Sequence, residues 1–114
     1  MGPQSKTGGL IMVGKYTVVT LCGSTKFKND FERVNRELTL AGNIVLSVGC
    51  FGYADNEVWA KGTKEMLDDM HKRKIDMADM IYVINKNGYI GESTRSEINY
   101  AREKGKEIIF MEEK

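Results

Sequence analysis

The chain has 114 residues, of which 41% are apolar, and its formal net charge is +1. This length allows one domain with a modest hydrophobic core, and a charge so close to zero does not favour nucleic acid or an acidic membrane surface as a partner. No apolar run approaches the roughly 20 residues that a membrane-spanning helix requires, so we expect neither nucleic acid nor a membrane among the partners.

The first residues differ in composition from the rest. Residues 2–9 contain the only proline and three of the twelve glycines. They also lack the apolar stretch of a signal peptide. We interpret residues 1–14 as a disordered N-terminal arm or the remnant of a tag, and residues 15–114 as a single domain.

Strand-like and helix-like segments alternate along this domain. β-Rich runs predict strands, and apolar residues at steps of three and four predict helices. The predicted strands are residues 16–21, 43–47, 80–85 and 107–110, and the predicted helices are residues 27–41, 63–78 and 93–104. This order predicts an α/β domain of the small doubly wound kind, Rossmann-like or flavodoxin-like, with a mainly parallel sheet in the strand order 2-1-3-4.

Two segments rich in glycine and hydroxyl groups follow the first and third predicted strands. Ligands of such sheets bind at the switch point beyond these strand ends, so we expect the two segments to face each other across one crevice. A helix start favours negative charge, although the hydroxyls can equally serve only as helix caps. The residues expected to contact a ligand here are Cys22, Gly23, Ser24, Thr25, Gly88, Gly91, Ser93 and Thr94.

The long segment after the second strand, residues 48–62, contains glycines and aromatic residues. A connection this long in a small domain is usually functional. We expect Gly49 and Phe51 to contact the substrate as part of a lid. A hydrophobic plug or a dimer contact is an equally good interpretation.

Glu97 and His71 are the candidate catalytic residues. Glu97 falls in the first turns of the third helix, where a partly buried carboxylate can act as nucleophile or base, or simply close a capping box. His71, the only histidine, falls on the inner side of the second helix. It can orient a ribose hydroxyl or Glu97, or it can be a core residue.

The two cysteines, Cys22 and Cys50, lie far apart and form no CxxC pair. With one histidine they do not make a usual zinc site, so we expect no metal. We expect both thiols to be reduced, as in a cytoplasmic protein.

Three segments together carry a resemblance to a known family. They are Cys22-Gly23-Ser24 after the first strand, the Ala78-Asp79 pair before the third, and Glu97-Ile98-Asn99-Tyr100-Ala101. In order and spacing they resemble the nucleoside 2-deoxyribosyltransferase-like superfamily, which includes 2′-deoxynucleoside 5′-monophosphate N-glycosidases. The resemblance extends from Tyr16 to about Phe110.

The resemblance implies an N-glycosidase or (deoxy)ribosyltransferase that cleaves the N-glycosidic bond of a nucleoside or nucleoside 5′-monophosphate. Glu97 would be the nucleophile, no metal or organic cofactor would be needed, and the chain would form a homodimer or larger homo-oligomer. His71 occupies the position of the family's catalytic aspartate, counted back from Asp79. This departure leaves open a non-catalytic nucleotide-binding or sequestering protein on the same fold, and a plain interaction domain is a further alternative.

Overall fold

The predicted alternation of strands and helices is present in the structure, a computed structural model that describes residues 14–113. Apart from Gly14, the expected N-terminal arm lies outside the described residues. The strands are β1 (Val18–Gly23), β2 (Ile44–Leu46), β3 (Met80–Ile84) and β4 (Glu107–Phe110). The helices are α1 (Lys28–Leu40), α2 (Thr63–Met77) and α3 (Glu92–Glu103), with short 3-10 turns η1 (Thr25–Phe27) and η2 (Lys86–Gly88).

The sheet has the predicted topology. Its order is β2-β1-β3-β4, and every neighbouring pair is parallel. Strand β1 extends two residues beyond the predicted end, because Cys22 and Gly23 pair with Val83 and Ile84 of β3. Weak local strand preference at a glycine is overridden by this pairing.

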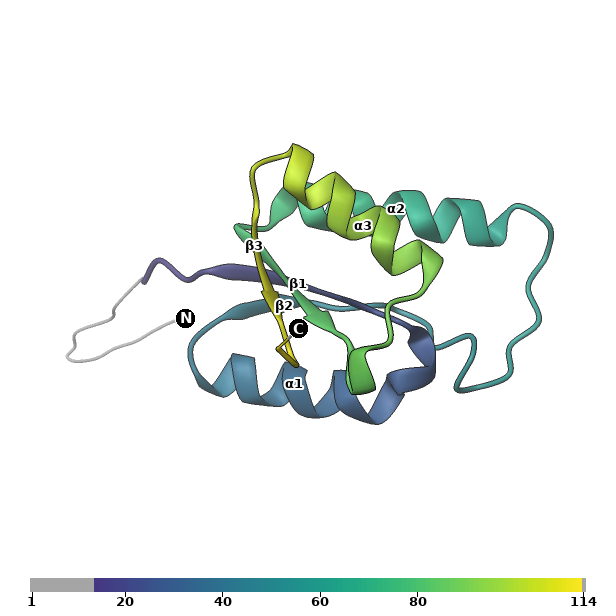
Figure 1. Cartoon of the computed structure of the whole chain (residues 1–114), viewed down its shortest axis with the longest axis horizontal. Helices are drawn as coiled ribbons and strands as arrows, with labels where there is room; N and C mark the ends of the chain where they lie inside the picture. Colours follow the sequence, from purple (N-terminus) through teal and green to yellow (C-terminus); the bar gives the residue numbers. More distant parts are fainter. Residues whose placement is uncertain (1–13, 114) are drawn as a thin grey trace.

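Helices cover both faces of the sheet, which explains why its central strands are apolar rather than alternating. Helix α1 covers one face, and α2 and α3 lie together on the other (Figure 1). Successive side chains of a strand point to opposite faces, so Leu21 packs on the α1 side and Cys22 on the α2/α3 side. The carboxyl ends of β1 and β3 meet between these layers.

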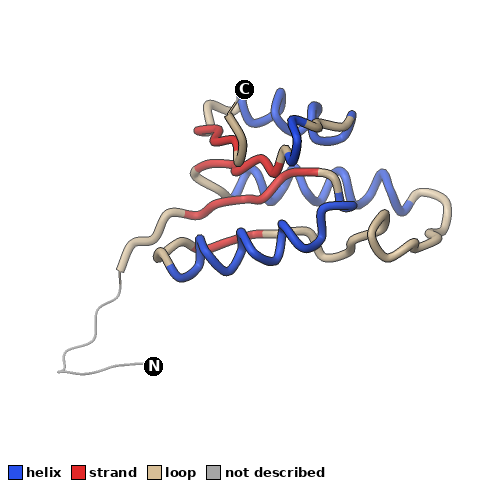
Figure 2. Tube along the Cα trace, turned by 60° about the horizontal axis from the view of Figure 1, so that its bottom comes forward, coloured by secondary structure: helices blue, strands red, loops and turns tan. Residues whose placement is uncertain are grey.

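The first helix starts later than predicted. Residues 25–27 form the 3-10 turn η1, and the Ser24 side chain accepts a hydrogen bond from the Lys26 amide at its start. Ser24 therefore caps this turn rather than α1 itself. Within the predicted apolar stripe of this helix, Phe31 and Val34 are buried, whereas Ala41 at the end of the stripe is exposed. Figure 2 shows the long loop between β2 and α2, which reaches beyond the sheet.

We expect Phe31→Ala to lower the free energy of unfolding by about 3–5 kcal/mol. Phe31 is 1% exposed and meets the Phe51 ring edge-on, with ring centres 5.4 Å apart, so truncation leaves a cavity on the α1 side of the core. Leu40→Ala is the matched control on the same helix, since Leu40 is 72% exposed and its loss should be under about 0.5 kcal/mol. Urea unfolding followed by circular dichroism measures both, and equal losses would contradict this packing.

Candidate functional site

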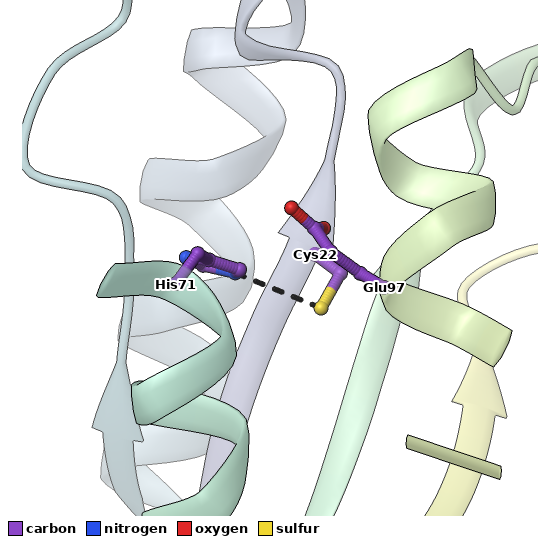
Figure 3. Close-up of side chains that lie close together, drawn as sticks. All are labelled: Cys22, His71 and Glu97. Carbon is purple, nitrogen blue, oxygen red and sulfur yellow. Dashed lines mark hydrogen bonds between the residues drawn. The ribbon is translucent and has the colours of Figure 1, made fainter. Parts of the chain in front are cut away.

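Cys22, His71 and Glu97 meet on the α2/α3 side of the sheet (Figure 3). They come from β1, α2 and α3 respectively. All three are buried, with exposures of 0%, 6% and 9%. One donor atom from each lies within 4.8 Å of the other two. The structure thus brings together both predicted catalytic residues and one predicted ligand contact, and we call this set the Cys-His-Glu cluster.

Local packing positions each member of the cluster. Cys22 is the next-to-last residue of β1, which points its side chain at α2 and α3 near the carboxyl end of the strand. On α3, the buried positions Thr94, Ile98 and Ala101 form a stripe that faces the sheet, as expected. Glu97 adjoins this stripe in the second turn, so its carboxylate is carried inward with it.

The His71 ring is held by the backbone of β1. Its Nε2 atom lies 2.9 Å from the Leu21 carbonyl oxygen, and the Cys22 Sγ atom lies 3.7 Å from the same nitrogen. A carbonyl oxygen only accepts hydrogen bonds, so Nε2 carries the proton and donates it to Leu21. This assignment leaves Nδ1 as the unprotonated nitrogen of the neutral ring.

Burial decides the charge states of His71 and Cys22. Burial, helped by the nearby positive charge of Lys74, lowers the pKa of His71 to about 4. Burial and the neighbouring Glu97 raise the pKa of the Cys22 thiol well above its ordinary value. At neutral pH the ring is therefore uncharged and the sulfur is a thiol, which argues against Cys22 as an attacking thiolate.

Glu97 is poised to gain or lose its proton near neutral pH. Burial, helped by the charge of Asp68, raises its pKa to about 7. A hydrogen bond from the Cys22 thiol and the positive charges of Lys72 and Lys64 act in the opposite direction. A carboxyl group with this pKa can serve as a nucleophile, a base or an acid, and such values are typical of functional sites.

Sequence reasoning missed the cations beside Glu97. The Lys64 ammonium lies 2.7 Å from the Asp68 carboxylate and also donates to the Ser93 hydroxyl at 3.2 Å. This link joins the start of α2 to the start of α3. The i, i+4 spacing of Lys64 and Asp68 was the available signal, but such pairs usually indicate only a solvated helix face.

Residues at the end of β1 and in the turn after it have structural roles that the sequence alone could not distinguish from ligand binding. A Cβ atom at Gly23 would lie 2.8 Å from the Ile84 carbonyl oxygen, so the close pairing of β1 and β3 requires glycine. The Thr25 hydroxyl accepts a hydrogen bond from the Tyr53 amide of the long loop. Gly23 and Ser24 nevertheless directly follow Cys22, at the same strand end as the cluster.

The start of α3 is not closed by the capping box that was the alternative interpretation of Glu97. Gly91 is its N-cap and provides no side-chain hydrogen bond. Thr94 is buried, and Ser93 is half-buried beside Lys64. Gly88 lies in the exposed turn η2, where its φ of +79° favours glycine.

The long loop does not bring its predicted contacts to the cluster. Phe51 packs in the core on the α1 side, against Phe31, whereas the cluster lies on the α2/α3 side. Gly49 is exposed, and a Cβ atom there would meet nothing within 4 Å. The apolar loop residues Tyr53 and Val58 are exposed as well.

The two loops at the switch point do approach each other. The rings of Phe27 and Tyr89 meet edge-on with centres 6.0 Å apart, and the Lys26 ammonium lies 3.6 Å from the centre of the Tyr89 ring. One surface hollow lies beside η1 and is lined in part by Lys26, Asp55 and Lys86. Another lies on the outer side of α3, and neither is lined by Cys22, His71 or Glu97.

The Asp79 of the proposed family motif has a structural partner. Its carboxylate accepts a hydrogen bond from the Val18 amide at 2.8 Å, and its own amide donates to the Val18 carbonyl oxygen. These bonds fix the amino ends of β1 and β3, at the edge of the sheet away from the cluster. Asp79 therefore aligns the strands rather than contributing to the site.

Comparisons with known proteins do not assign a family. No model of a protein family matches the chain, and no curated protein sequence matches it significantly. Within residues 14–113, no helix is both long and apolar enough to cross a membrane.

The buried carboxyl group predicts a distinctive dependence of stability on pH. Folding raises the pKa of Glu97 from 4.5 to about 7, so the folded protein holds this proton more tightly than the unfolded chain. The resulting stabilisation is complete below pH 4.5 and is lost as the pH rises through about 7. Between pH 5 and pH 8, the free energy of unfolding of Glu97→Gln should therefore rise by about 2.5 kcal/mol relative to that of the wild type.

Urea unfolding at a series of pH values measures this difference. His71 has the opposite effect, because its lowered pKa removes stability as the pH falls from 6.5 towards about 4. This effect is present in both proteins, so it cancels in the comparison. Glu92→Gln, at an exposed carboxylate on the same helix, is the control and should show no such trend. A difference between Glu97→Gln and wild type that does not change with pH would show that Glu97 is not buried in its protonated form.

Proposed function

We propose that this protein cleaves the N-glycosidic bond of a nucleoside or a nucleoside 5′-monophosphate, with Glu97 as the nucleophile. One observation carries the proposal: a buried carboxyl group with a pKa near 7 adjoins the carboxyl end of β1, at the switch point of the sheet. The resemblance of three sequence segments to the nucleoside 2-deoxyribosyltransferase-like superfamily supports it. By the same resemblance, the chain forms a homodimer or larger homo-oligomer, and its two free cysteines support a cytoplasmic location.

The reaction follows the double displacement of retaining glycosidases. The ionised Glu97 attacks C1′ of the sugar while the base leaves with the bonding electrons and takes a proton from solvent. Water, or a second base in a transfer reaction, then attacks C1′ and releases Glu97. Because Glu97 is only 9% exposed, neighbouring side chains must move for a sugar to reach its carboxylate.

The rest of the cluster prepares the carboxylate for attack. The neighbouring Cys22 thiol lowers the pKa of Glu97 and so favours the ionised form of the carboxylate. His71 donates a hydrogen bond to the Leu21 carbonyl oxygen and lies on the α2 side of the site. It is uncharged at neutral pH, so it holds position here rather than supplying the proton that an aspartic acid would.

The start of α3 and its neighbouring lysine suit a 5′-phosphate. No side chain caps the first amides of α3, which leaves them free to donate to an anion. Lys64 lies within hydrogen-bond distance of Ser93 in the same turn. A phosphate there would meet backbone amides, a hydroxyl and an ammonium group, so a monophosphate is the favoured substrate.

Glu97→Ala should reduce the release of free base by about 10³-fold or more, because it removes the attacking group. A panel of nucleosides and their 5′-monophosphates is incubated with the protein, and free base is measured by chromatography. Glu103→Ala, at an exposed carboxylate in the last turn of α3, is the matched control and should retain activity. Turnover that survives Glu97→Ala would remove Glu97 from the mechanism. If no substrate is cleaved but a nucleotide raises the melting temperature, the non-catalytic alternative replaces this proposal.

The pH profile distinguishes a nucleophile from an acid. A nucleophilic Glu97 must be ionised, so kcat/KM should rise about tenfold per pH unit up to about 7 and then level off. Steady-state kinetics from pH 5 to pH 9 measure this profile. A decline of kcat/KM above pH 7 would indicate instead that the protonated Glu97 is required.

A further inference from the structure

We propose that Cys22, His71 and Glu97 bind one Zn²⁺ ion through three protein ligands, with a fourth position left for water. The ligand atoms are the Cys22 sulfur, the His71 Nε2 atom and one carboxylate oxygen of Glu97. They come from three different elements of the fold and converge at one buried point (Figure 3). The sequence pointed away from a metal because Glu97 lies 75 residues beyond Cys22 and only the fold adds it to the donor set.

The spacing of the donors supports a shared metal. With Zn–S near 2.3 Å and Zn–N near 2.05 Å, tetrahedral angles place sulfur and nitrogen about 3.6 Å apart. The Cys22 sulfur and the His71 Nε2 atom are 3.7 Å apart. All three donor atoms lie within 4.8 Å of one another. A movement of the Glu97 side chain by about 1 Å therefore brings its oxygen to a tetrahedral position.

The donor types select zinc over harder ions. Thiolate and imidazole ligands suit Zn²⁺, whereas Mg²⁺ and Ca²⁺ take oxygen ligands. Three protein ligands with one open position are the arrangement of reactive zinc sites, while structural sites have four. The buried position excludes most competing water.

Binding changes the protonation of all three ligands. The Cys22 thiol loses its proton to solvent as the Zn–S bond forms. The His71 proton leaves Nε2, the hydrogen bond from Nε2 to the Leu21 carbonyl oxygen at 2.9 Å breaks, and the ring turns so that its Nε2 lone pair faces the metal. The neutral ring then carries its proton on Nδ1. Glu97 binds as the carboxylate, so any proton it carries is released to solvent, and no oxidation or reduction is involved.

Zinc and a sugar cannot use Glu97 at the same time. A carboxylate oxygen held on the metal is not available to attack C1′, so zinc would act as an inhibitor of the proposed glycosidase. This consequence rests on the proposed function, whereas the binding of zinc itself does not.

Cobalt serves as the spectroscopic probe for the site. We expect Co²⁺ to give a cobalt–thiolate charge-transfer band with the wild-type chain, and equimolar Zn²⁺ to remove it. Cys22→Ser should lose the band, whereas Cys50→Ser, at the exposed cysteine, should keep it. A band that persists in Cys22→Ser, or its absence from the wild type, would overturn the proposed site.

Affinity measurements test the other two ligands. In competition with a chromophoric chelator, His71→Gln and Glu97→Gln should each weaken Zn²⁺ binding at least about tenfold. Glu92→Gln is the control and should leave the affinity unchanged. Unchanged affinity in either ligand variant would remove that residue from the site.

X-ray absorption of the zinc-loaded wild-type chain requires no variant. We expect one sulfur at about 2.3 Å and nitrogen or oxygen ligands at about 2.0–2.2 Å. A zinc environment without sulfur would overturn the proposal even if a variant failed to fold. Base release is assayed separately, with and without Zn²⁺. Turnover by a chain that does not bind zinc would overturn only the zinc site, and zinc binding without turnover would overturn only the proposed glycosidase.

Discussion

Strand β1 is hydrogen-bonded along both edges and covered by helices on both faces, and the site depends on this burial. Because β1 is shielded from water, its polar groups need hydrogen-bond partners within the protein. The Thr20 hydroxyl donates to the Lys74 carbonyl oxygen, and the Leu21 carbonyl accepts from His71. These two hydrogen bonds fix the position of α2 along β1, and they place His71 beside Cys22.

The cluster is a polar group of side chains inside an otherwise apolar layer. Cys22 packs with Ile75, Val83 and Ile98 in the core on this side of the sheet, and Glu97 adjoins Cys22. Burial favours the neutral form of each titratable member, which raises the pKa of Glu97 and lowers that of His71. The protein thereby keeps an acid near its half-ionised point at neutral pH, at a cost in stability that grows as the pH rises from 4.5 to about 7.

The same geometry relates the two proposed activities. A desolvated carboxylate beside a thiol is suited to attack a sugar carbon, and the same thiol, imidazole and carboxylate are suited to a borderline-soft cation. Substrate and metal would compete for one oxygen of Glu97. Metal occupancy would then control whether the nucleophile is available.

The sequence by itself determined the α/β class, the strand order and the position of each helix, because apolar periodicity reports which faces are buried. It also identified Glu97 and His71 as inward-facing residues of their helices. Only the tertiary structure decided that both meet Cys22, that Phe51 packs on the opposite side, and that Gly91 leaves α3 uncapped. The physical reason is that local patterns specify the face of an element, whereas the register between elements depends on packing and on long-range bonds such as that from His71 to Leu21.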